Sequence, residues 1–370
     1  MLKCAIVGTG AVAHFHARAT LSHPRARLVG ITNRTRTKAE EFATVWGDPP
    51  VYDDLAQLLA EQRPDVVMIC TSPDVHLEQA RACFDAGAHV VVEKPPAPSL
   101  EELDEMRAVA AAADRQMAVM FQQRTGTAAA HFKQLLDSGA LGRPLIAQCQ
   151  TLWYRGLDYF AVPWRGSWET EGGGTTLGHS IHQLDLLCFL LGDWATVEGR
   201  LWRLDRETQT EDSSTATITF RNGVVATSIS TTLAPRQVSA VRIDTQRATI
   251  TVEHLYGHGH DNWSITPAPG VSDEEFATWA LPEHEVRSDH DPLLHDVFDS
   301  ILDGTPLPAT ADEPARSLEV VAAIYASAAA DGAVITPEIL AHHPTHRRSF
   351  ESPVLDMRDT AHSSMGSDAS

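Results

Sequence analysis

The stretch Leu2-Lys3-Cys4-Ala5-Ile6-Val7-Gly8-Thr9-Gly10-Ala11-Val12-Ala13 decides the fold. It joins an apolar strand to a turn of the form G-x-G-x-x-A, and a helical pattern follows to about Ser22. In such a turn the first glycine permits the bend, the second lets a pyrophosphate approach the backbone, and the small last residue lets helix and strand pack closely. The helix N-terminus adds free N–H groups and a positive dipole end. We therefore predict a dinucleotide site with contacts from Gly8, Thr9, Gly10, Ala11 and Val12.

Strand and helix patterns alternate over about the first 120 residues, and this arrangement is typical of βαβ units in a parallel, doubly wound sheet. The capping-box pattern Ser99-Leu100-Glu101-Glu102 opens the last of the helices. Predicted strands are Leu2–Val7, Ala26–Thr32, Val66–Cys70, Ala88–Val92 and Met117–Phe121, and predicted helices between them include Thr37–Trp46 and His76–Ala86.

Beyond about residue 125 the pattern changes to runs of neighbouring strands, which favour an antiparallel sheet. Asn222-Gly223 between two of these runs is a hairpin signal. We expect an α/β protein with domains at 1–123 and 124–340 and a polar, loosely ordered tail at 341–370. The predicted elements are helices at Ala128–Ser138 and Ala311–Ala330 and strands at Leu145–Tyr154, Thr196–Leu204, Ser213–Phe220, Val224–Leu233, Val238–Asp244 and Ala248–Leu255.

Composition narrows the class of protein. A chain of 370 residues with 43% apolar residues can bury the cores of two domains. Its net charge of -20 argues against nucleic acid and anionic membrane surfaces as partners. The chain has no charged lead followed by an apolar segment, and no apolar run approaches the roughly 20 residues of a membrane helix. Five scattered cysteines without a Cys-x-x-Cys pair favour reduced thiols, and we expect a cytoplasmic protein.

The residues after the second strand bear on the choice of dinucleotide. NAD sites place an Asp or Glu about 20 residues after the turn, where it binds the ribose 2′-hydroxyl. This chain has Asn33 there, followed by Arg34, Arg36 and Lys38. A guanidinium matches a 2′-phosphate, so we slightly favour NADP over NAD, with Asn33, Arg34 and Lys38 as contacts. The alternative is that these are solvated charges at a helix start.

A second informative stretch is Ala88-His89-Val90-Val91-Val92-Glu93-Lys94-Pro95-Pro96. It is a buried strand that runs straight into a charged pair held by proline, whose φ is fixed. Ligands of an open parallel sheet bind beyond the carboxyl ends of its strands. Lys94 is therefore a candidate for chemistry, although an ordinary lysine at the sheet edge remains the alternative.

Two histidines follow a run of three glycines, Gly172-Gly173-Gly174, which permits the close approach of a ligand. Ile181, Leu184, Leu187, Cys188 and Leu191 share one helix face, while His179, His182 and Asp185 share the other. Histidine serves as an acid or base near neutral pH. The alternatives are histidines satisfied within an interface or a His-x-x-His metal site. Because no third ligand is evident, we predict no metal.

Aromatic and arginine residues gather upstream, in Trp153-Tyr154-Arg155 and Trp164-Arg165-Gly166-Ser167-Trp168. Flat rings with hydrogen-bond donors suit a sugar or a carboxylate. We predict that Tyr154, Trp164, Arg165, His179 and His182 contact the substrate, with packing as the alternative. His254, His258 and His260 are assigned to a loop.

Together these motifs resemble the Gfo/Idh/MocA oxidoreductases over nearly the whole chain, to about Pro337. The resemblance implies a Rossmann domain, then an α/β domain with an open, mostly antiparallel sheet that often serves oligomerisation, here as a homo-oligomer (dimer or tetramer). It implies hydride transfer between NAD(P) and a secondary alcohol of a sugar, inositol or related polyol. It places Lys94 and His182 as catalytic residues, and adds as cofactor contacts Thr71, Ser72, Pro73, His76, Glu93, Lys94 and Gln122.

One position departs from the family pattern G-G-G-x-x-x-D-x-x-x-H, because Gly178 stands where the aspartate is expected. His179 is next to it and could take part of the role. Lys94 or His182 then removes the hydroxyl proton. Two alternatives stay open: a redox-neutral glycosidase with tightly bound NAD, and a non-catalytic, NAD(P)-binding regulatory protein.

Overall fold

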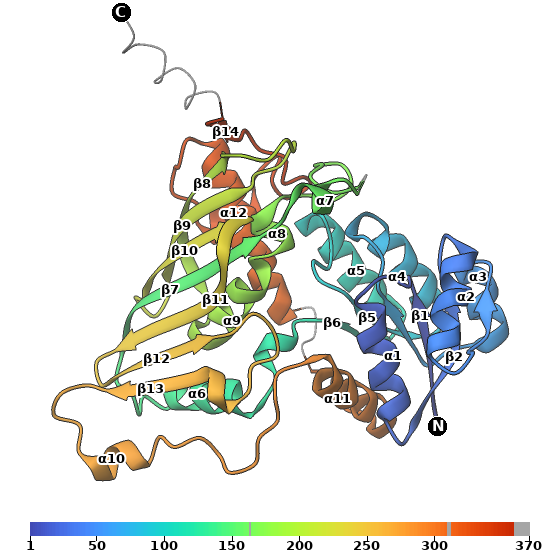
Figure 1. The fold of residues 1–370 in the computed structure, drawn as a ribbon, viewed down its shortest axis with the longest axis horizontal. Helices are drawn as coiled ribbons and strands as arrows, with labels where there is room; N and C mark the ends of the chain where they lie inside the picture. The colour runs from blue at the N-terminus through green and yellow to red at the C-terminus, as the bar shows by residue number, and fades with distance from the viewer. Residues whose placement is uncertain (163, 309–311, 359–370) are drawn as a thin grey trace, which may run out of the picture. The chain divides into compact units, whose positions relative to one another are not determined.

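The computed structural model describes residues 1–162, 164–308 and 312–358. The chain forms two compact units. Unit 1 comprises Met1–Ala97, Glu101–Thr125 and Ser288–Ala315, and unit 2 comprises the rest of the described chain. Figure 1 labels the helices and strands of both.

Unit 1 is built on a six-stranded sheet in the order β3-β2-β1-β4-β5-β6, and all its neighbouring strands are parallel. The strand order reverses between β1 and β4, and ligands of such sheets bind beyond the strand ends at this switch point. The predicted doubly wound sheet is confirmed. The strands are β1 (Leu2–Val7), β2 (Ala26–Thr32), β3 (Val51–Tyr52), β4 (Val66–Ile69), β5 (His89–Val92) and β6 (Met117–Val119).

Helices connect these strands as the sequence predicts, with one addition. β3 and the helix after it, α3, were not predicted, because β3 has only two residues and shows no alternation. Asp54 begins α3 by accepting a hydrogen bond from the N–H of Gln57. The helices are α1 (Ala13–Ser22), α2 (Arg36–Val45), α3 (Leu55–Gln62), α4 (His76–Asp85) and α5 (Leu100–Ala112), with single 3₁₀ turns η1 (Pro73–Val75) and η2 (Gln122–Arg124).

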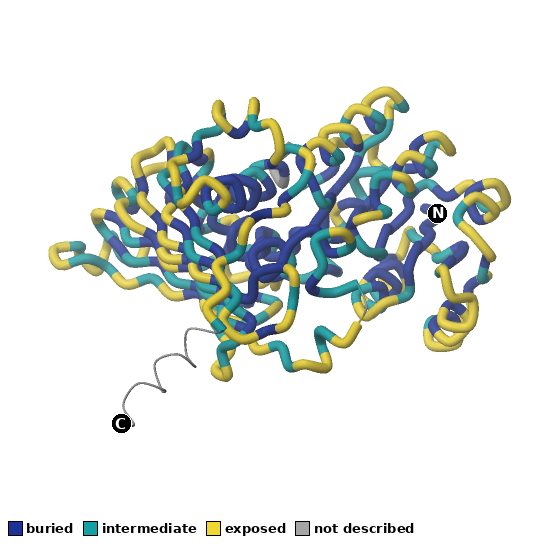
Figure 2. The backbone as a smooth tube through the Cα atoms, turned by 90° about the horizontal axis from the view of Figure 1, so that it is seen from above, coloured by how far each residue is buried: buried dark blue, intermediate teal, exposed yellow. Residues whose placement is uncertain are grey.

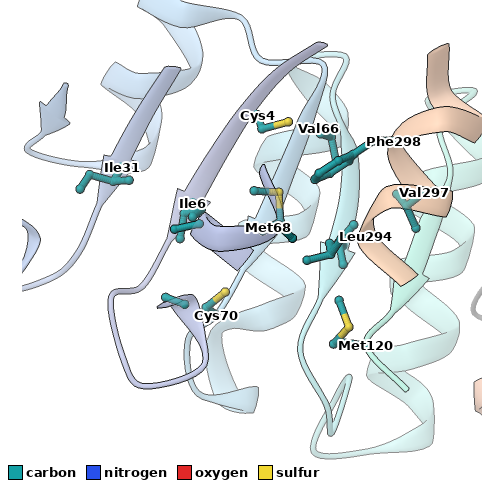
Figure 3. Close-up of a cluster of buried hydrophobic side chains, with 14 of the residues drawn as sticks. Cys4, Ile6, Ile31, Val66, Met68, Cys70, Met120, Leu294, Val297 and Phe298 are labelled. Carbon is teal, nitrogen blue, oxygen red and sulfur yellow. The ribbon is translucent and has the colours of Figure 1, made fainter. Parts of the chain in front are cut away.

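A helix from the distant C-terminal part of the chain completes the core of unit 1. This helix, α11 (His290–Asp303), buries Leu293, Leu294, Val297 and Phe298 at helical spacing. Figure 3 shows Leu294 and Phe298 close to the sheet residues Val66 and Met68, and all of them belong to one buried cluster. The predicted second domain, 124–340, was continuous and so included α11. Tertiary packing places this helix in unit 1 instead.

Unit 2 contains an eight-stranded sheet in the order β13-β12-β11-β7-β10-β9-β8-β14. Only the β7–β10 and β8–β14 pairs are parallel, which confirms a mostly antiparallel sheet. The Asn222-Gly223 turn joins β9 to β10, with Gly223 at φ 88°. The strands are β7 (Pro144–Tyr154), β8 (Trp194–Arg203), β9 (Ser213–Phe220), β10 (Val225–Thr231), β11 (Leu233–Thr245), β12 (Ala248–Glu253), β13 (Trp263–Pro267) and β14 (Leu355–Asp356).

Helices α8 and α9 pack on one face of this sheet. Exposed and buried positions alternate along β10, so the face of the sheet away from these helices is open (Figure 2). Helix α9 is buried at all positions except Phe189, so the predicted two-faced pattern does not describe it. The helices are α6 (Thr127–Asp137), α7 (Leu157–Phe160), α8 (Thr175–Gly178), α9 (Ile181–Leu191), α10 (Asp273–Ala277), α12 (Asp312–Ala329) and α13 (Pro337–Ala341), with the 3₁₀ turn η3 (His260–Asn262).

The predicted loose tail, 341–370, is ordered over its described part. Phe350 is buried and stacks on Tyr325 with ring centroids 5.7 Å apart. Strand β14 pairs with β8. Residues 359–370 lie outside the described part. None of the helices in the described ranges is long and apolar enough to cross a membrane.

Candidate active site

The predicted dinucleotide turn leads from β1 into α1. Gly8 has φ 89°, and a Cβ on it would lie 2.7 Å from the carbonyl oxygen of Cys70, so only glycine fits there. Gly10 differs, because no heavy atom of the described chain lies within 4 Å of the place of its Cβ. The open side of Gly10 is available to a ligand.

Further groups at this turn fit a phosphate-bearing ligand. No side chain caps the N-terminus of α1, so its positive dipole end is open to an anion, although the N–H groups of Ala13 and Phe15 already donate to the carbonyl oxygens of Gly10 and Val12. The Thr9 hydroxyl oxygen is buried and has no hydrogen-bond partner within the described residues. The same is true of Gln122 Oε1, which follows β6. Buried polar atoms are normally paired, so these two are suited to a bound molecule.

The end of β2 carries the residues predicted to contact the ribose. The backbone N–H of Thr9 points to Asn33 Oδ1 at 3.4 Å. Arg36 pairs with Glu40 at 2.8 Å and with Asp53. Arg34 and Lys38 are exposed, and neither forms an ion pair with any residue that the structure describes. Two of the three cations thus remain available to a 2′-phosphate.

His76 joins the ends of two strands. Its ring is buried, with one nitrogen 3.1 Å from the carbonyl oxygen of Thr71 and the other 3.0 Å from that of Pro96. Burial lowers the pKa of His76, which favours the neutral ring. We interpret His76 as a link between these two turns. Thr71 donates a side-chain hydrogen bond to Gln79 at 2.7 Å.

Lys94 follows β5 at the carboxyl edge of the sheet and is half-buried. Its peptide bond to Pro95 is cis. The side chain of the preceding residue, Glu93, is buried and accepts a hydrogen bond from the Lys94 N–H at 3.2 Å. Glu93 was predicted as a cofactor contact, but its carboxylate binds the backbone N–H of the next residue in the chain.

Sequence reasoning missed the partners of Glu93. His16 Nε2 on α1 lies 2.7 Å from Glu93 Oε1, and His290 Nε2 on α11 lies 3.5 Å from the same oxygen. Asp289 lies 3.3 Å from the other ring nitrogen of His290. The sequence did contain a hint for His16. It is a polar residue between Ala13 and Ala17 on the buried, apolar face of α1. No spacing rule connects it to a residue 77 positions away.

Burial and hydrogen bonding oppose each other in this cluster. Burial lowers the pKa of His16. Burial also disfavours charge on His290, but hydrogen bonds to Asp289 and Glu93 outweigh it and raise the pKa of His290 to about 9. In the same way, burial acts to raise the pKa of Glu93, but the two histidines hold it well below its usual range. The ionised pair is therefore Glu93 with His290.

In unit 2, the three glycines make room for the protein itself. A Cβ on Gly173 would collide with the Tyr325 hydroxyl, and one on Gly174 with the backbone of Glu211. The close approach predicted for a ligand is thus made by this chain. The buried Glu211 carboxylate accepts hydrogen bonds from Tyr325 at 2.8 Å and from the N–H of Thr176 at 2.9 Å. Glu211, which sequence reasoning missed, fixes the turn, and its burial raises its pKa.

His179 and His182 lie beside one aromatic pair, Trp153 and Tyr256, whose centroids are 5.3 Å apart. His179 meets the edge of Trp153 at 5.2 Å, and His182 meets Tyr256 at 6.3 Å. Both histidines are buried. Asp185, predicted to share their face, instead accepts a hydrogen bond from Ser317 on α12 at 2.7 Å.

Arg165 and Tyr159 connect this aromatic group to a carboxylate. The Tyr159 hydroxyl lies 3.2 Å from His179 Nε2, and Arg165 donates to the same hydroxyl. Arg165 also lies 3.4 Å from Glu171 and over the ring of Trp164 at 4.2 Å. The structure thus groups His179, Arg165 and Trp164. Tyr154 does not join them, since it is 47% exposed and its ring faces Arg206.

Glu171 lies beside the glycine that departs from the family pattern. A Cβ on Gly178 would stand 3.7 Å from Glu171 Oε1, while Oε2 accepts the N–H of Gly166 at 2.6 Å. A buried carboxylate therefore occupies the neighbourhood that an aspartate at position 178 would reach. Sequence reasoning missed Glu171.

His16, Glu93 and His290 also have ligand types that suit a metal ion, and their ligand atoms lie within 4.8 Å of one another. This is the one such group among the described residues, and it includes neither His179 nor His182. The absence of a resident metal stays a prediction.

Comparisons with known proteins agree with this arrangement. Residues 2–121 match the family model described as an oxidoreductase family with an NAD-binding Rossmann fold, and residues 129–253 match the GFO/IDH/MocA C-terminal domain. The D-glucoside 3-dehydrogenase of Escherichia coli is 26% identical over 88% of this chain and 95% of its own length. The scyllo-inositol 2-dehydrogenase (NAD(+)) of Bacillus subtilis is 28% identical over 52% of this chain and 54% of its own length.

A solved structure shares the fold. The WlbA dehydrogenase of Chromobacterium violaceum, in complex with NADH and UDP-GlcNAcA, superposes with a TM-score of 0.78 at 25% identity, covering 90% of this chain and 95% of that one. With both family models matched and the Rossmann sheet in place, the chain belongs to the Gfo/Idh/MocA family and is an NAD(P)-dependent dehydrogenase.

Proposed function

We propose that this protein transfers hydride between a nicotinamide cofactor and a secondary alcohol of a sugar, inositol or sugar derivative. The observation that carries the proposal is Lys94, held at the carboxyl end of β5 in the sheet that also presents the open dinucleotide turn at Gly10. Relatives named as glucoside and inositol dehydrogenases support the substrate class.

The residues of the chain have separate tasks in this proposal. The turn from Gly8 to Val12, with Asn33, Thr71, Ser72 and Gln122, holds the cofactor. When bound, the nicotinamide supplies the hydride acceptor or donor. Lys94 and His182 take or return the proton of the substrate hydroxyl. Arg165, Trp164 and His179 orient the substrate.

The group around Tyr159 supports a polar, partly anionic substrate. Arg155 and Arg165 both lie over the Tyr159 ring, at 5.4 Å and 3.8 Å from its centroid. A ring with two guanidinium groups provides a flat surface and charged donors, which suit a sugar or a sugar acid.

For the cofactor we propose NADP over NAD, because Arg34 and Lys38 are exposed and without ion pairs in the described part of the chain. A 2′-phosphate supplies the charge that would pair with them.

The test is an assay of reduced-cofactor absorbance with sugars, inositols and sugar acids, run with NADPH and with NADH. We expect Lys94→Ala and His182→Ala each to lower turnover by at least about 100-fold, since positioned proton transfer contributes that much. Cofactor binding, followed by fluorescence of the reduced nicotinamide, should remain. Near-normal turnover in both variants contradicts the assignment, and a preference for NADH contradicts the choice of NADP.

The same assay separates the alternatives. Cleavage of a glycoside without net consumption of cofactor indicates a redox-neutral glycosidase. Tight cofactor binding with no oxidation of any substrate in the panel indicates a regulatory protein.

We also propose a homo-oligomer, formed through the open face of the sheet in unit 2. Ile146 on β7 and Val225 on β10 are register partners, and both are exposed on that face together with Ile229. Apolar side chains gathered on one open sheet face are typical of interaction surfaces.

A further inference from the structure

The Glu93 carboxylate divides its two oxygens between different tasks. Oε2 accepts the backbone N–H of Lys94 at 3.2 Å. Oε1 faces His16 at 2.7 Å and His290 at 3.5 Å. The residue that precedes the proposed proton carrier is thus held from both sides.

The two histidines come from elements with their own links to the site. His16 lies on α1, the helix that begins at the dinucleotide turn. His290 is the first residue of α11, and its ring stacks on Phe15 of α1 at 4.8 Å. All these residues belong to unit 1. One cluster therefore connects α1 with the backbone of Lys94.

Burying the charges of this cluster lowers the stability of the fold relative to an apolar core. Taking a carboxylate out of water is unfavourable even after relaxation, and Glu93 is only 4% exposed. Apolar side chains of similar volume stabilise a core at least as well as a buried ion pair. A role in the site accounts for keeping charge at this position.

His290 carries the positive charge that offsets Glu93. Farther out, Arg18 faces two carboxylates, Asp289 at 3.3 Å and Asp291 at 2.8 Å, so this outer group has a net negative charge. Cys70 and His76 also interact with Glu93, and burial favours the neutral form of both. The carboxylate that precedes Lys94 in the chain therefore belongs to a neutral pair. A lone carboxylate there would stabilise the ammonium form of Lys94.

A metal ion bound by the same side chains fits less well. A histidine that binds a metal through Nε2 carries its proton on Nδ1, and that N–H normally has an acceptor. His16 Nδ1 is buried and has no hydrogen-bond partner among the described residues. When Nε2–H instead donates to Glu93, Nδ1 carries only a lone pair, and no N–H group is left unpaired.

We propose that His16, Glu93 and His290 are positioning residues that fix the backbone of Lys94 and neutralise the charge beside it, linking the proton carrier to the helix of the dinucleotide turn. This inference rests on the proposed function, in which Lys94 handles the substrate proton.

The experiment compares His290→Gln and Glu93→Gln with the double variant. His290→Gln leaves the carboxylate without its counter-charge, so the ionisation of Lys94 should move to higher pH by about one unit. In the double variant both charges are gone, so the ionisation should return toward the wild-type position. We expect kcat to fall at least about 10-fold in each variant, with the affinity for the reduced cofactor within about 2-fold of wild type.

The matched control is His295→Gln. His295 also lies on α11 and contacts α1, through the carbonyl oxygen of Ala19 at 3.0 Å, but it does not touch Glu93. It should leave kcat and the pH profile unchanged. If it reproduces the effects of His290→Gln, the cluster only docks α11, and the proposal is wrong.

A second measurement needs no substrate. Trace acetylation of Lys94 by acetic anhydride, followed by peptide mass spectrometry over a range of pH, reports the ionisation and accessibility of its amine. Absence of turnover with every alcohol would remove the proposed function, while the labelling would still decide whether the cluster acts on Lys94. Labelling profiles that superimpose in wild type, His290→Gln and Glu93→Gln, with all three folded, overturn the proposal.

Discussion

Glu171 offers a compensation for the glycine at position 178. We expect Glu171→Gln to lower turnover by about 10-fold, because Arg165 loses its carboxylate partner 3.4 Å away. Adding Gly178→Asp to this variant should restore part of the activity by returning a carboxylate to the same neighbourhood. The measurement is kcat/KM of the single and double variants. Glu169→Gln, at an exposed position two residues earlier, is the control. Failure of the double variant to exceed Glu171→Gln would argue against compensation.

At the scale of single residues, the sequence predicts site residues that are adjacent to a motif. It misses those that only the tertiary fold brings to the site. Lys94 can be found because its strand and Pro95 are its sequence neighbours. His16 and His290 cannot, because each reaches their common partner Glu93 only through the tertiary packing of its own helix, α1 or α11. The three glycines were expected to admit a ligand, but the structure places Tyr325 and Glu211 of this chain against Gly173 and Gly174.

At the scale of elements, the contact of α11 with the rest of unit 1 should depend on pH. The pKa of His290 is raised from 6.5 to about 9 in the folded protein, so its contribution is complete below pH 6.5 and is lost as the pH rises through about 9. The lowered pKa of Glu93 acts in the opposite sense, since its contribution is lost as the pH falls below its ordinary value of 4.5. The pair therefore stabilises unit 1 most between pH 4.5 and pH 6.5.

We expect the apparent melting temperature of wild type to exceed that of His290→Gln in this window and the difference to shrink toward pH 9. The contribution from His290 is at most about 3.5 kcal/mol, because each unit of pKa shift is worth about 1.4 kcal/mol. Thermal unfolding followed by intrinsic fluorescence over a pH series is the measurement, with His295→Gln as the control. A difference that does not change with pH would contradict this assignment.

Elements were predictable in proportion to their length and regularity. The strands β1, β2 and β9 have the predicted bounds because their apolar patterns end at clear turns. Helix α9 was expected to have one polar face, yet it is buried on all sides, since α12 covers the Asp185 side. Burial by a helix so far along the chain leaves no trace in local periodicity.

At the scale of the whole molecule, the open sheet face predicts self-association. Replacing Ile146 and Ile229 by lysine should shift the sedimentation mass toward the monomer, because charges in an apolar interface remain unpaired. Val45→Lys is the control, at a position on α2 that is 63% exposed. A wild-type protein that sediments as a monomer at all concentrations would contradict the proposed oligomer.

The return of α11 to unit 1 also has a consequence for biosynthesis. Domains generally fold as units while the chain is still being translated, the N-terminal one first. Here the first unit lacks Leu294, Val297 and Phe298 until residues 288–315 have left the ribosome, when most of unit 2 is already made. The apolar sheet residues that Figure 3 shows next to α11 stay exposed to solvent during that interval. The apolar core of unit 1, and the Glu93 cluster with it, is therefore completed only after residues 126–287 of unit 2 have been made.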